Sequence, residues 1–570
     1  MLVAGVSIVV MLGQHLRPGS SSTVGGHLGY SQQRSSAPVQ LTDNTIHPIA
    51  QLANSAQAEW SKTLNQQSKT LDAAVAEYRR RYKMSPPPNF DKWFEFARTR
   101  DVQIIDEYDT IYHSLLPFWA LSPATIRARA REAIGHAENR LVGLLLRDGK
   151  TVRVEGGDDW QQRATVGLVE HFTEYLPDMD LAFNIHDEPR VALSSAGLDG
   201  LVAAGLHEIA STGLTLQNAF SPRPADVSAG QRIEEVKTTR FNYFPHQPTW
   251  GSAKVSCAAS TPVGCLQEAA DDLSTYALGD LGFVYNRTAF TDICNSPSLE
   301  TSHGFFERAN AFSVTHDLFP IFSQSKMSSF QDITYPSPWY WYDKAPYFEA
   351  MDMEWSKKEN KMWWRGSTTG GYTQDGGWRR QHRQQLVRKI NAPDKAKILT
   401  PRWSLTDTER QDHKSLFDVH FSSVVQCDVG DCAAQNEFFT LAPVADQQES
   451  WKSKYLLDID GNAYSGRFYA LLKSNSLVFK MAVFREWHEE WIKPWVHYIP
   501  LSLRGEEILE AVRYVDAEPE GQELGSLMAE TSSQWAKSAL RKEDFEAWFF
   551  RLLLEYGRLV DDNRSNIGFT

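Results

Sequence analysis

One stretch, from Lys454 to Met481, constrains the fold of this chain most strongly. An apolar run from Tyr455 to Ile459 leads into a loop that contains Gly461 and Gly466, and a short helix and a second apolar run follow. Strand, glycine-bearing turn, helix and strand in this order predict a βαβ unit. In such a unit the helix N-terminus, with its unpaired backbone N–H groups, lies at the carboxyl end of the first strand.

The loop of this unit carries groups that suit a diphosphate. Ser465 supplies a hydroxyl and Arg467 a guanidinium fork, beside the positive end of the helix dipole. Two or three charge-assisted hydrogen bonds, each worth roughly 1.5–3 kcal/mol, would hold a nucleotide diphosphate at micromolar concentration. The alternative is a surface helix with a solvated arginine. The string GNAYSG leaves both interpretations open, because it is neither a P-loop nor a GxGxxG motif.

A second strand end in the same region also carries an arginine. Residues 361–371 read KMWWRGSTTGG, an aromatic strand that ends in a glycine-containing loop. Since open α/β sheets bind ligands at strand ends, Arg365 is predicted to pair with a phosphate, with Ser367, Thr368 and Gly370 lining its pocket. The alternative is a tight turn that needs glycine for its backbone angles.

A candidate base follows a strand in the first half of the chain. The apolar run Leu181–Ile185 ends at His186-Asp187-Glu188. A carboxylate at the carboxyl end of a strand can take a proton from an incoming hydroxyl, which makes Asp187 a candidate general base. An aspartate that caps the following turn is the alternative. His186 is interpreted as a packed neighbour and not as a second base.

Two DxD strings, Asp178-Met-Asp180 and Asp458-Ile-Asp460, have the spacing that can hold a divalent ion against a diphosphate. Because arginines already suit the diphosphate, both strings are interpreted as structural and no metal is expected. Glu486, which follows the βαβ unit, is predicted either to accept hydrogen bonds from a ribose diol or to begin a helix.

Size and composition narrow the class of protein. The chain of 570 residues is long enough for roughly three or four structural units. Its net charge is −13 and no basic stripe stands out, which excludes a nucleic-acid partner. None of the five cysteines forms a CxxC pair or has histidines at metal spacing, so a zinc site is rejected.

Several features suggest the secretory pathway. Leu2–Leu12 is an apolar run that resembles a signal-peptide core or the truncated end of a type II membrane anchor, and residues 13–45 read as a flexible stem. Cys257 with Cys265, and Cys427 with Cys432, are close enough to close small loops in an oxidising lumen, which leaves one cysteine over. Sequons stand at Asn286 and Asn563 and would be glycosylated only in that pathway.

The rest of the chain reads as alternating helices and strands. A long helix is predicted over 49–82, more helix over 90–119 and 123–134, and a helical tail over 505–556. Residues 141–322 predict an α/β domain with a largely parallel sheet, interrupted by a surface insertion over 192–276. Residues 361–500 predict a second α/β block, with strands at the strings KMWWRGS, SLFDVHFS, KYLLDID, SLVFKM and HYIPL.

Taken together, six strings resemble glycosyltransferase family 90, the capsule-associated fungal glycosyltransferases related to the Rumi-type protein O-glucosyl/xylosyltransferases. They occur in the right order over roughly residues 75 to 560. The strings are YRRRY…PPPNFDKW with IIDEYD and PFW; LPDMDLAFNIHDEPRV; FSQSKMSSFQDITYP; KMWWRGSTTGG; KYLLDIDGNAYSGRFYALLKSNSLVFK; and IKPWVHYIPL.

The resemblance implies an α/β fold of the GT-B type, in which two Rossmann-like domains face a cleft, here with helical extensions at both ends. The expected parts are an anchor remnant and stem over 1–48, a helical region over 49–140, an acceptor-side domain over 141–345, a UDP-sugar domain over 346–540, and a C-terminal helix and tail over 541–570.

The resemblance also implies roles for residues. Asp187 matches the family's catalytic base, and the animal enzymes have arginine where His186 stands. Arg365, Ser465 and Arg467 match positions that contact UDP, and Ser325 with Lys326 lies in a strip that borders the donor pocket. The full expected UDP-sugar-binding set is Arg365, Gly366, Ser367, Gly461, Ala463, Tyr464, Ser465, Arg467, Ser325, Lys326 and Glu486.

The expected function is therefore an inverting, metal-independent transfer of a sugar, xylose or glucose, from a UDP-sugar to a hydroxyl of a glycan or glycoprotein. No cofactor is expected, and the expected location is the Golgi or endoplasmic reticulum lumen, with an N-terminal membrane anchor as one option. The alternative from another class is an inactive UDP-sugar- or carbohydrate-binding protein of the secretory lumen.

Overall fold

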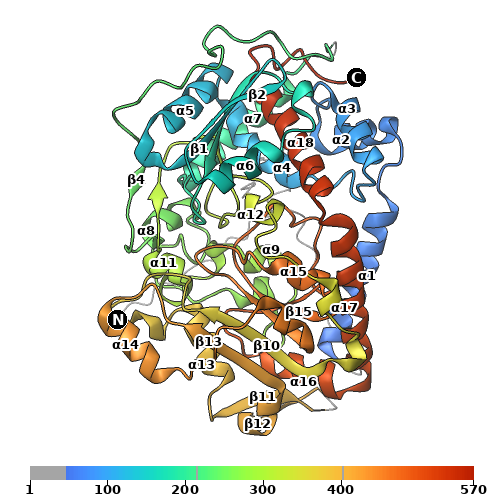
Figure 1. Ribbon diagram of the computed structural model, residues 1–570, viewed down its shortest axis with the longest axis vertical. Helices are drawn as coiled ribbons and strands as arrows, with labels where there is room; N and C mark the ends of the chain where they lie inside the picture. The colour runs from blue at the N-terminus through green and yellow to red at the C-terminus, as the bar shows by residue number, and fades with distance from the viewer. Residues whose placement is uncertain (1–45, 214–215, 401–402) are drawn as a thin grey trace, which may run out of the picture.

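Two five-stranded sheets, one in each lobe, organise the chain in the computed structural model, which describes residues 46–213, 216–400 and 403–570 (Figure 1). The N-terminal lobe holds strands β1, β2, β3, β8 and β9, and the C-terminal lobe holds β10 and β13 to β16. The predicted signal or anchor segment and the stem lie outside the described residues. Within those three described ranges, no helix has the length and apolar character needed to cross a membrane.

The sheet of the C-terminal lobe is parallel throughout, in the order β13-β10-β14-β15-β16. This confirms the predicted α/β block and its five strand strings. The predicted βαβ unit is also confirmed, because helix α15 connects strands β14 and β15, which are parallel neighbours in the sheet. All residues of these two strands are buried except Lys454. The elements are β10 (Glu359–Ser367), β13 (Phe417–Ser423), β14 (Ser453–Ile459), α15 (Phe468–Lys473), β15 (Leu477–Met481) and β16 (Ile499–Pro500).

The sheet of the N-terminal lobe has the order β2-β1-β3-β8-β9, and the prediction that it is largely parallel is wrong. Strand β1 pairs antiparallel with both β2 and β3, while β3–β8 and β8–β9 are parallel. A two-residue turn, Asp148-Gly149, joins β1 to β2 with positive φ at both residues, which is the hairpin turn that Asp-Gly favours. The strands are β1 (Leu141–Arg147), β2 (Lys150–Glu155), β3 (Met179–Asn184), β8 (Ile321–Ser323) and β9 (Ile333–Thr334).

The long N-terminal helix predicted over 49–82 is two helices, α1 (Pro48–Asn65) and α2 (Leu71–Tyr82). The break comes at Thr70, whose side chain accepts a hydrogen bond from the Ala73 N–H and so begins a new helix. The region 90–119 is likewise divided, whereas the helix at 123–134 is confirmed. These helices are α3 (Phe90–Thr99), α4 (Asp109–Leu115) and α5 (Pro123–Gly135).

The segment 192–276 begins with a regular helix, so the prediction of a surface insertion is wrong for its first part. Helix α7 (Ser195–Ala210) packs closely on the turn at Leu116–Ala120, and a Cβ on Gly205 would lie 2.4 Å from the Leu116 carbonyl oxygen. Residues 280–285 contain β6 (Phe283–Val284). This strand pairs with β5 (Ala277–Leu278) and not with the five-stranded sheet of the N-terminal lobe. Other short elements are α6 (Asp159–Gly167), β4 (Asn242–Tyr243), α8 (Trp250–Ala253), α9 (Arg287–Phe290), α10 (Leu299–Ser302), α11 (Gly304–Arg308), β7 (Ser313–Val314) and α12 (Pro338–Trp341).

The C-terminal tail is helical, as predicted, and it connects the two lobes. Helix α17 (Pro519–Ala539) packs on α15 in the C-terminal lobe, and α18 (Lys542–Leu559) crosses to the N-terminal lobe beside α3 and α4 (Figure 1). The Trp93 indole N–H donates to the Ala547 carbonyl oxygen at 2.9 Å. The C-terminal lobe also has α13 (His382–Ile390), β11 (Lys395–Leu399), β12 (Leu405–Glu409), α14 (Val429–Phe438) and α16 (Ile508–Ala517).

The disulfides differ in part from the predicted loops. Cys427 bonds to Cys432 as predicted, but Cys257 bonds to Cys294, 37 residues away, and not to Cys265, which is the free thiol. Tertiary structure explains the difference. The Val263 N–H donates to the Cys294 carbonyl oxygen, which holds the segment around Cys294 against the loop that contains Cys257. Short sequence spacing alone therefore gave a wrong partner for Cys257.

Candidate functional site

The loop between β14 and α15, Asp460–Arg467, lies at the carboxyl end of the parallel sheet. The Asp460 carboxylate accepts hydrogen bonds from the backbone N–H groups of Val483 and Phe484 at 2.7 and 3.0 Å, which ties the loop to the segment after β15. Within the loop, the Gly461 N–H donates to the Ala463 carbonyl oxygen at 2.8 Å. The predicted residues of this loop therefore share one compact turn at the edge where parallel sheets bind ligands.

Tyr464 connects this loop to the N-terminal lobe. Its hydroxyl donates to the Gln324 side-chain oxygen at 2.7 Å and lies 2.6 Å from the Ser337 hydroxyl. Gln324 directly follows β8 and Ser337 precedes α12, and neither residue was predicted as a site residue. Asp187 is close enough to raise the pKa of Tyr464, although burial is the larger cause.

Helix α12 holds the next two loop residues through its aromatic side chains. The Tyr340 hydroxyl donates to the Ser465 carbonyl oxygen at 2.8 Å, and the Trp339 indole N–H donates to the Gly466 carbonyl oxygen at 3.2 Å. Three consecutive loop residues are thus held by one short segment of the N-terminal half. No local sequence pattern predicts these contacts, because their partners lie more than 100 residues apart in the chain.

Asp187 follows β3, on the side of the N-terminal lobe that faces the loop. Its side chain is exposed, and desolvation by the surrounding protein raises its pKa. Its neighbours are held neutral near pH 7: burial raises the pKa of Glu188 to about 8 and lowers that of His186 to about 4. An accessible carboxylate between two neutral side chains is suited to accept a proton. The interpretation of His186 as a packed neighbour fits its low pKa.

The two predicted arginines have different surroundings. Arg467 lies in the loop, and its guanidinium donates to the Arg365 carbonyl oxygen at 2.6 Å. The Arg365 guanidinium instead pairs with Asp418 of β13, at 2.8 Å to the carboxylate and 2.9 Å to the carbonyl oxygen. Arg365 therefore already has a protein counter-charge, which the sequence did not predict.

Several buried polar atoms near these strand ends have no hydrogen-bond partner among the described residues. They are the Ser325 hydroxyl and one carboxylate oxygen each of Asp458, Asp460 and Glu486. Glu486 is buried, and its pKa is raised to about 8 by that burial. Leaving a buried polar atom unpaired costs about 1–3 kcal/mol, so such a group of atoms is typical of a site completed by a polar ligand or water.

Lys326, predicted to border the donor pocket, joins the lobes through its backbone. Its N–H and C=O pair with those of Arg485 at 2.9 and 2.8 Å, directly before Glu486. Its ammonium group donates to the Asp332 carbonyl oxygen at 2.9 Å, and burial lowers its pKa to about 8. The FSQSK strip is thus in contact with the segment that carries Glu486.

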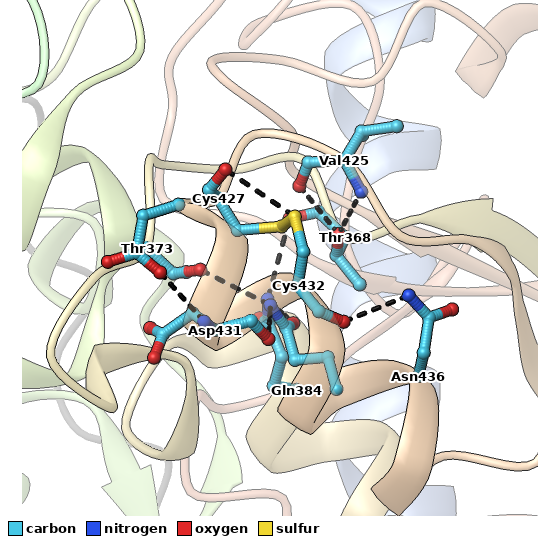
Figure 2. The surroundings of a disulfide bond; sticks show 10 residues. Thr368, Thr373, Gln384, Val425, Cys427, Asp431, Cys432 and Asn436 are labelled. Atoms are coloured by element: carbon cyan, nitrogen blue, oxygen red, sulfur yellow. Dashed lines mark hydrogen bonds between the residues drawn. A yellow bond between two sulfur atoms is a disulfide. The ribbon is translucent and has the colours of Figure 1, made fainter.

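The predicted loop after β10 is fixed by close packing and by the nearby disulfide. A Cβ on Gly366 would lie 2.5 Å from the Trp364 ring, and the Ser367 hydroxyl donates to that of Thr369 at 3.2 Å. The Thr368 hydroxyl exchanges hydrogen bonds with the Val425 backbone, two residues before the disulfide at Cys427 (Figure 2). Gly370 and Gly371 have positive φ, so the turn does need glycine, as the alternative interpretation stated.

Arg383, on α13, was missed by the sequence analysis. Its buried guanidinium donates to the carbonyl oxygens of Asp460, Ser367 and Ile459 at 2.7, 3.0 and 3.0 Å. It therefore fixes the ends of β10 and β14 relative to each other. In the sequence it stands in a strongly basic string, which is usually a solvated helix face.

Both DxD strings have protein partners. Arg147 donates to Asp180 at 2.6 Å, the Asp148 N–H donates to Asp178 at 2.7 Å, and Lys480 donates to Asp458 at 2.7 Å. Within the described parts of the chain, no group of three or more histidine, cysteine, aspartate or glutamate side chains is arranged to hold a metal ion.

Replacing Asp180 by alanine is expected to destabilise the protein by about 3–5 kcal/mol, because it leaves the buried Arg147 charge unpaired. The midpoint of urea unfolding measures this effect. Asp199→Ala is the matched control, since Asp199 is exposed within helix α7 and its replacement should change stability by no more than about 0.5 kcal/mol. Equal midpoints for the two variants would show that the Asp180 pair is not structural.

Comparisons with known proteins show what this chain is similar to. The sequence profile described as "Glycosyl transferase family 90" matches residues 305–565, which include the β10 end and the β14–α15 loop but not Asp187. Human "Protein O-glucosyltransferase 1" is 26% identical over 267 residues, which are 43% of this chain and 58% of that protein. The "O-glucosyltransferase rumi homolog" of Anopheles gambiae is 34% identical over 117 residues, 20% of this chain and 28% of that protein.

The match covers only part of each protein. The chain spans 58% of the length of the human relative and 56% of the length of the Aedes aegypti "O-glucosyltransferase rumi homolog", to which it is 26% identical. The family match at 305–565 includes the β14–α15 loop, the end of β10 and the segments that carry Ser325, Lys326 and Glu486. Over residues 305–565 the chain matches glycosyltransferase family 90, and part of it is similar to the Rumi-type O-glucosyltransferases.

Proposed function

We propose that this protein is an inverting glycosyltransferase that moves a sugar, xylose or glucose, from a UDP-sugar to a hydroxyl group of a glycan or glycoprotein. One observation carries the proposal: Tyr464 of the β14–α15 loop, which has the groups for a diphosphate, is hydrogen-bonded to Gln324 and Ser337 of the N-terminal lobe and lies near Asp187. In this proposal the two lobes are the two Rossmann-like domains of a GT-B fold, and the reaction takes place where they meet.

Asp187 acts as the general base. Its carboxylate takes the proton of the acceptor hydroxyl, and the oxygen attacks the anomeric carbon from the face opposite the phosphate. The carbon–oxygen bond to the diphosphate breaks and UDP leaves with the electron pair, so the anomeric configuration inverts. The raised pKa of Asp187 brings the base closer to neutral pH, which improves proton transfer.

The β14–α15 loop stabilises the leaving group. Arg467 and the Ser465 hydroxyl lie at the N-terminus of α15, and the hydrogen bond to the Arg365 carbonyl oxygen holds the Arg467 guanidinium before the charge develops on the diphosphate. Arg365 contributes its remaining N–H donors while Asp418 holds its orientation. No metal is assigned a role, because arginines supply the positive charge in this proposal.

The experiment that tests the function is a UDP-release assay with UDP-xylose, UDP-glucose and UDP-galactose, each with and without saccharide acceptors. Acceptor-stimulated release from at least one donor is expected, and it should persist in EDTA. UDP binding without any release would instead support the inactive binding protein.

The proposed location is the lumen of the secretory pathway. Support comes from the two disulfides, which form and persist in oxidising compartments, and from the apolar run at residues 2–12. Glycosidase treatment of the secreted protein, followed by mass spectrometry at the Asn286 and Asn563 sequons, tests this placement.

The acid limb of the kcat/KM profile is expected above the ordinary aspartate pKa of about 4, because desolvation by the surrounding protein raises the pKa of Asp187. Activity should be lost as the pH falls through that raised pKa, since a protonated carboxyl cannot take the acceptor's proton. Glu188→Gln should leave the limb in place: with a pKa of about 8, Glu188 is already protonated there, and the amide keeps an oxygen for the Ala311 N–H. An acid limb at or below about pH 4 would contradict the assignment.

A further inference from the structure

A partly exposed aromatic cluster lies beside the candidate site and has no role in the proposed mechanism. The cluster consists of Trp160, Trp339 and Tyr342, and we call it the platform. The Trp160 and Trp339 rings meet edge to face with centroids 5.9 Å apart, and Trp160 and Tyr342 are 6.2 Å apart. Trp339 is 37% exposed and Tyr342 36% exposed, while Trp160 is half-buried, so the three neighbouring rings together offer apolar surface to a ligand.

The platform lies between the candidate base and the β14–α15 loop. On one side, the Trp339 indole N–H is bonded to the Gly466 carbonyl oxygen in that loop. On the other side, Trp160 lies in the first turn of α6. The side chain of the next residue, Gln161, donates a hydrogen bond to the Ile185 carbonyl oxygen, two residues before Asp187. Figure 1 shows α6 and α12 together between the two sheets, and Gly167 of α6 packs against the Trp341 ring.

The Trp339 ring is held in place. The indole N–H of Trp339 donates to the Gly466 carbonyl oxygen. The ring also packs directly on Gly466, since a Cβ on Gly466 would lie 2.7 Å from the indole nitrogen, so Trp339 cannot move toward the loop. A rigid exposed indole whose polar atom is already bonded offers an apolar surface to a ligand at little cost in conformational entropy.

The chemistry of the platform fits a sugar ring. The face of a pyranose that carries C–H groups packs flat on an aromatic ring, and its hydroxyl groups remain at the edge. Lys344, 4.5 Å above the Trp160 ring, and Arg163, 6.0 Å from the Tyr342 ring, supply donors for such hydroxyl oxygens at the rim. A folded protein would need about 800 Å² of matching surface on each partner, far more than three side chains.

We propose that the acceptor is a saccharide, and that one of its sugar rings packs on the Trp339 indole, with Trp160 standing edge to face beside it, so that a hydroxyl group reaches Asp187. This inference rests on the proposed function and names the acceptor class for that same site. A polypeptide hydroxyl as the acceptor is the competing outcome.

The test compares Trp160→Ala with the wild type in the UDP-release assay. Trp160 makes no contact with the β14–α15 loop, so its variant should raise KM for a methyl glycoside acceptor about tenfold while kcat and the Kd for UDP stay within about twofold. Trp339→Phe, which keeps a ring but loses the N–H, should raise KM less than Trp339→Ala. Phe438→Ala, an aromatic residue 54% exposed on α14, is the control and should change nothing.

The acceptor probes are the methyl glycosides of glucose, mannose, galactose and xylose, and a serine-containing peptide. Stimulation by the peptide alone, with an unchanged KM in Trp160→Ala, would overturn the saccharide proposal and leave the transferase function standing. If no donor is turned over at all, saturation-transfer NMR of the four glycosides on wild type and Trp160→Ala still tests the platform. Loss of the wild-type signal in the variant is expected, and equal signals would overturn the proposal.

Discussion

Replacing Asp187 by asparagine is expected to lower acceptor-dependent UDP release by about 10²–10⁴-fold, the usual contribution of a positioned general base. The amide has nearly the same shape but cannot take a proton. Because the Asp187 side chain is exposed and has no hydrogen bond to the described protein, the substitution should leave folding unchanged. The Kd for UDP should also stay the same, since the diphosphate groups lie in the β14–α15 loop.

The measurements are UDP release at saturating donor, calorimetric binding of UDP and the thermal unfolding midpoint. Asp343→Asn is the matched control: Asp343 is also an exposed aspartate near the meeting point of the lobes, but it stands in a turn after α12 and contacts no residue of the loop. Near-full transfer by Asp187→Asn would remove the base from the mechanism, whereas a lost UDP affinity would show that Asp187 belongs to the donor site.

The elements that could be predicted from sequence are those with local signals. The βαβ unit at 454–481 was predicted because two apolar runs flank a glycine-bearing loop, and both strands are buried on both faces. The β10 strand and the hydroxyl-rich turn after it were predicted for the same reason. The Asp148-Gly149 hairpin carried a local signal as well, and recognising it would have shown that β1 and β2 are antiparallel.

The contacts that could not be predicted join segments far apart in the chain. Arg383 holds carbonyl oxygens of two strand ends, and nothing near it in sequence distinguishes it from the exposed Arg388. The pairing of Arg365 with Asp418 depends on β10 and β13 being neighbours in the sheet, with Trp363 directly opposite Asp418. Such partners are set by strand order, which local patterns do not contain.

Replacing Arg467 by alanine is expected to lower kcat by about 10²–10³-fold and to weaken UDP binding, because one fixed donor to the developing charge is typically worth about 2.7–4 kcal/mol. The loss should exceed that of Arg365→Ala. Arg365 already shares its guanidinium with Asp418, whereas Arg467 gives one hydrogen bond to a neutral carbonyl oxygen and keeps its full charge for the diphosphate.

Arg467→Lys separates charge from geometry. A lysine keeps the positive charge but lacks the planar fork, so it should restore part of the UDP affinity and less of kcat. Arg388→Ala is the control, since Arg388 is exposed on α13 and bonds only to Gln385. UDP affinity untouched in Arg467→Ala would remove the diphosphate from this loop. A larger loss in Arg365→Ala would place the phosphates at the end of β10 instead, and the Asp418 pair would then have to open when the donor binds.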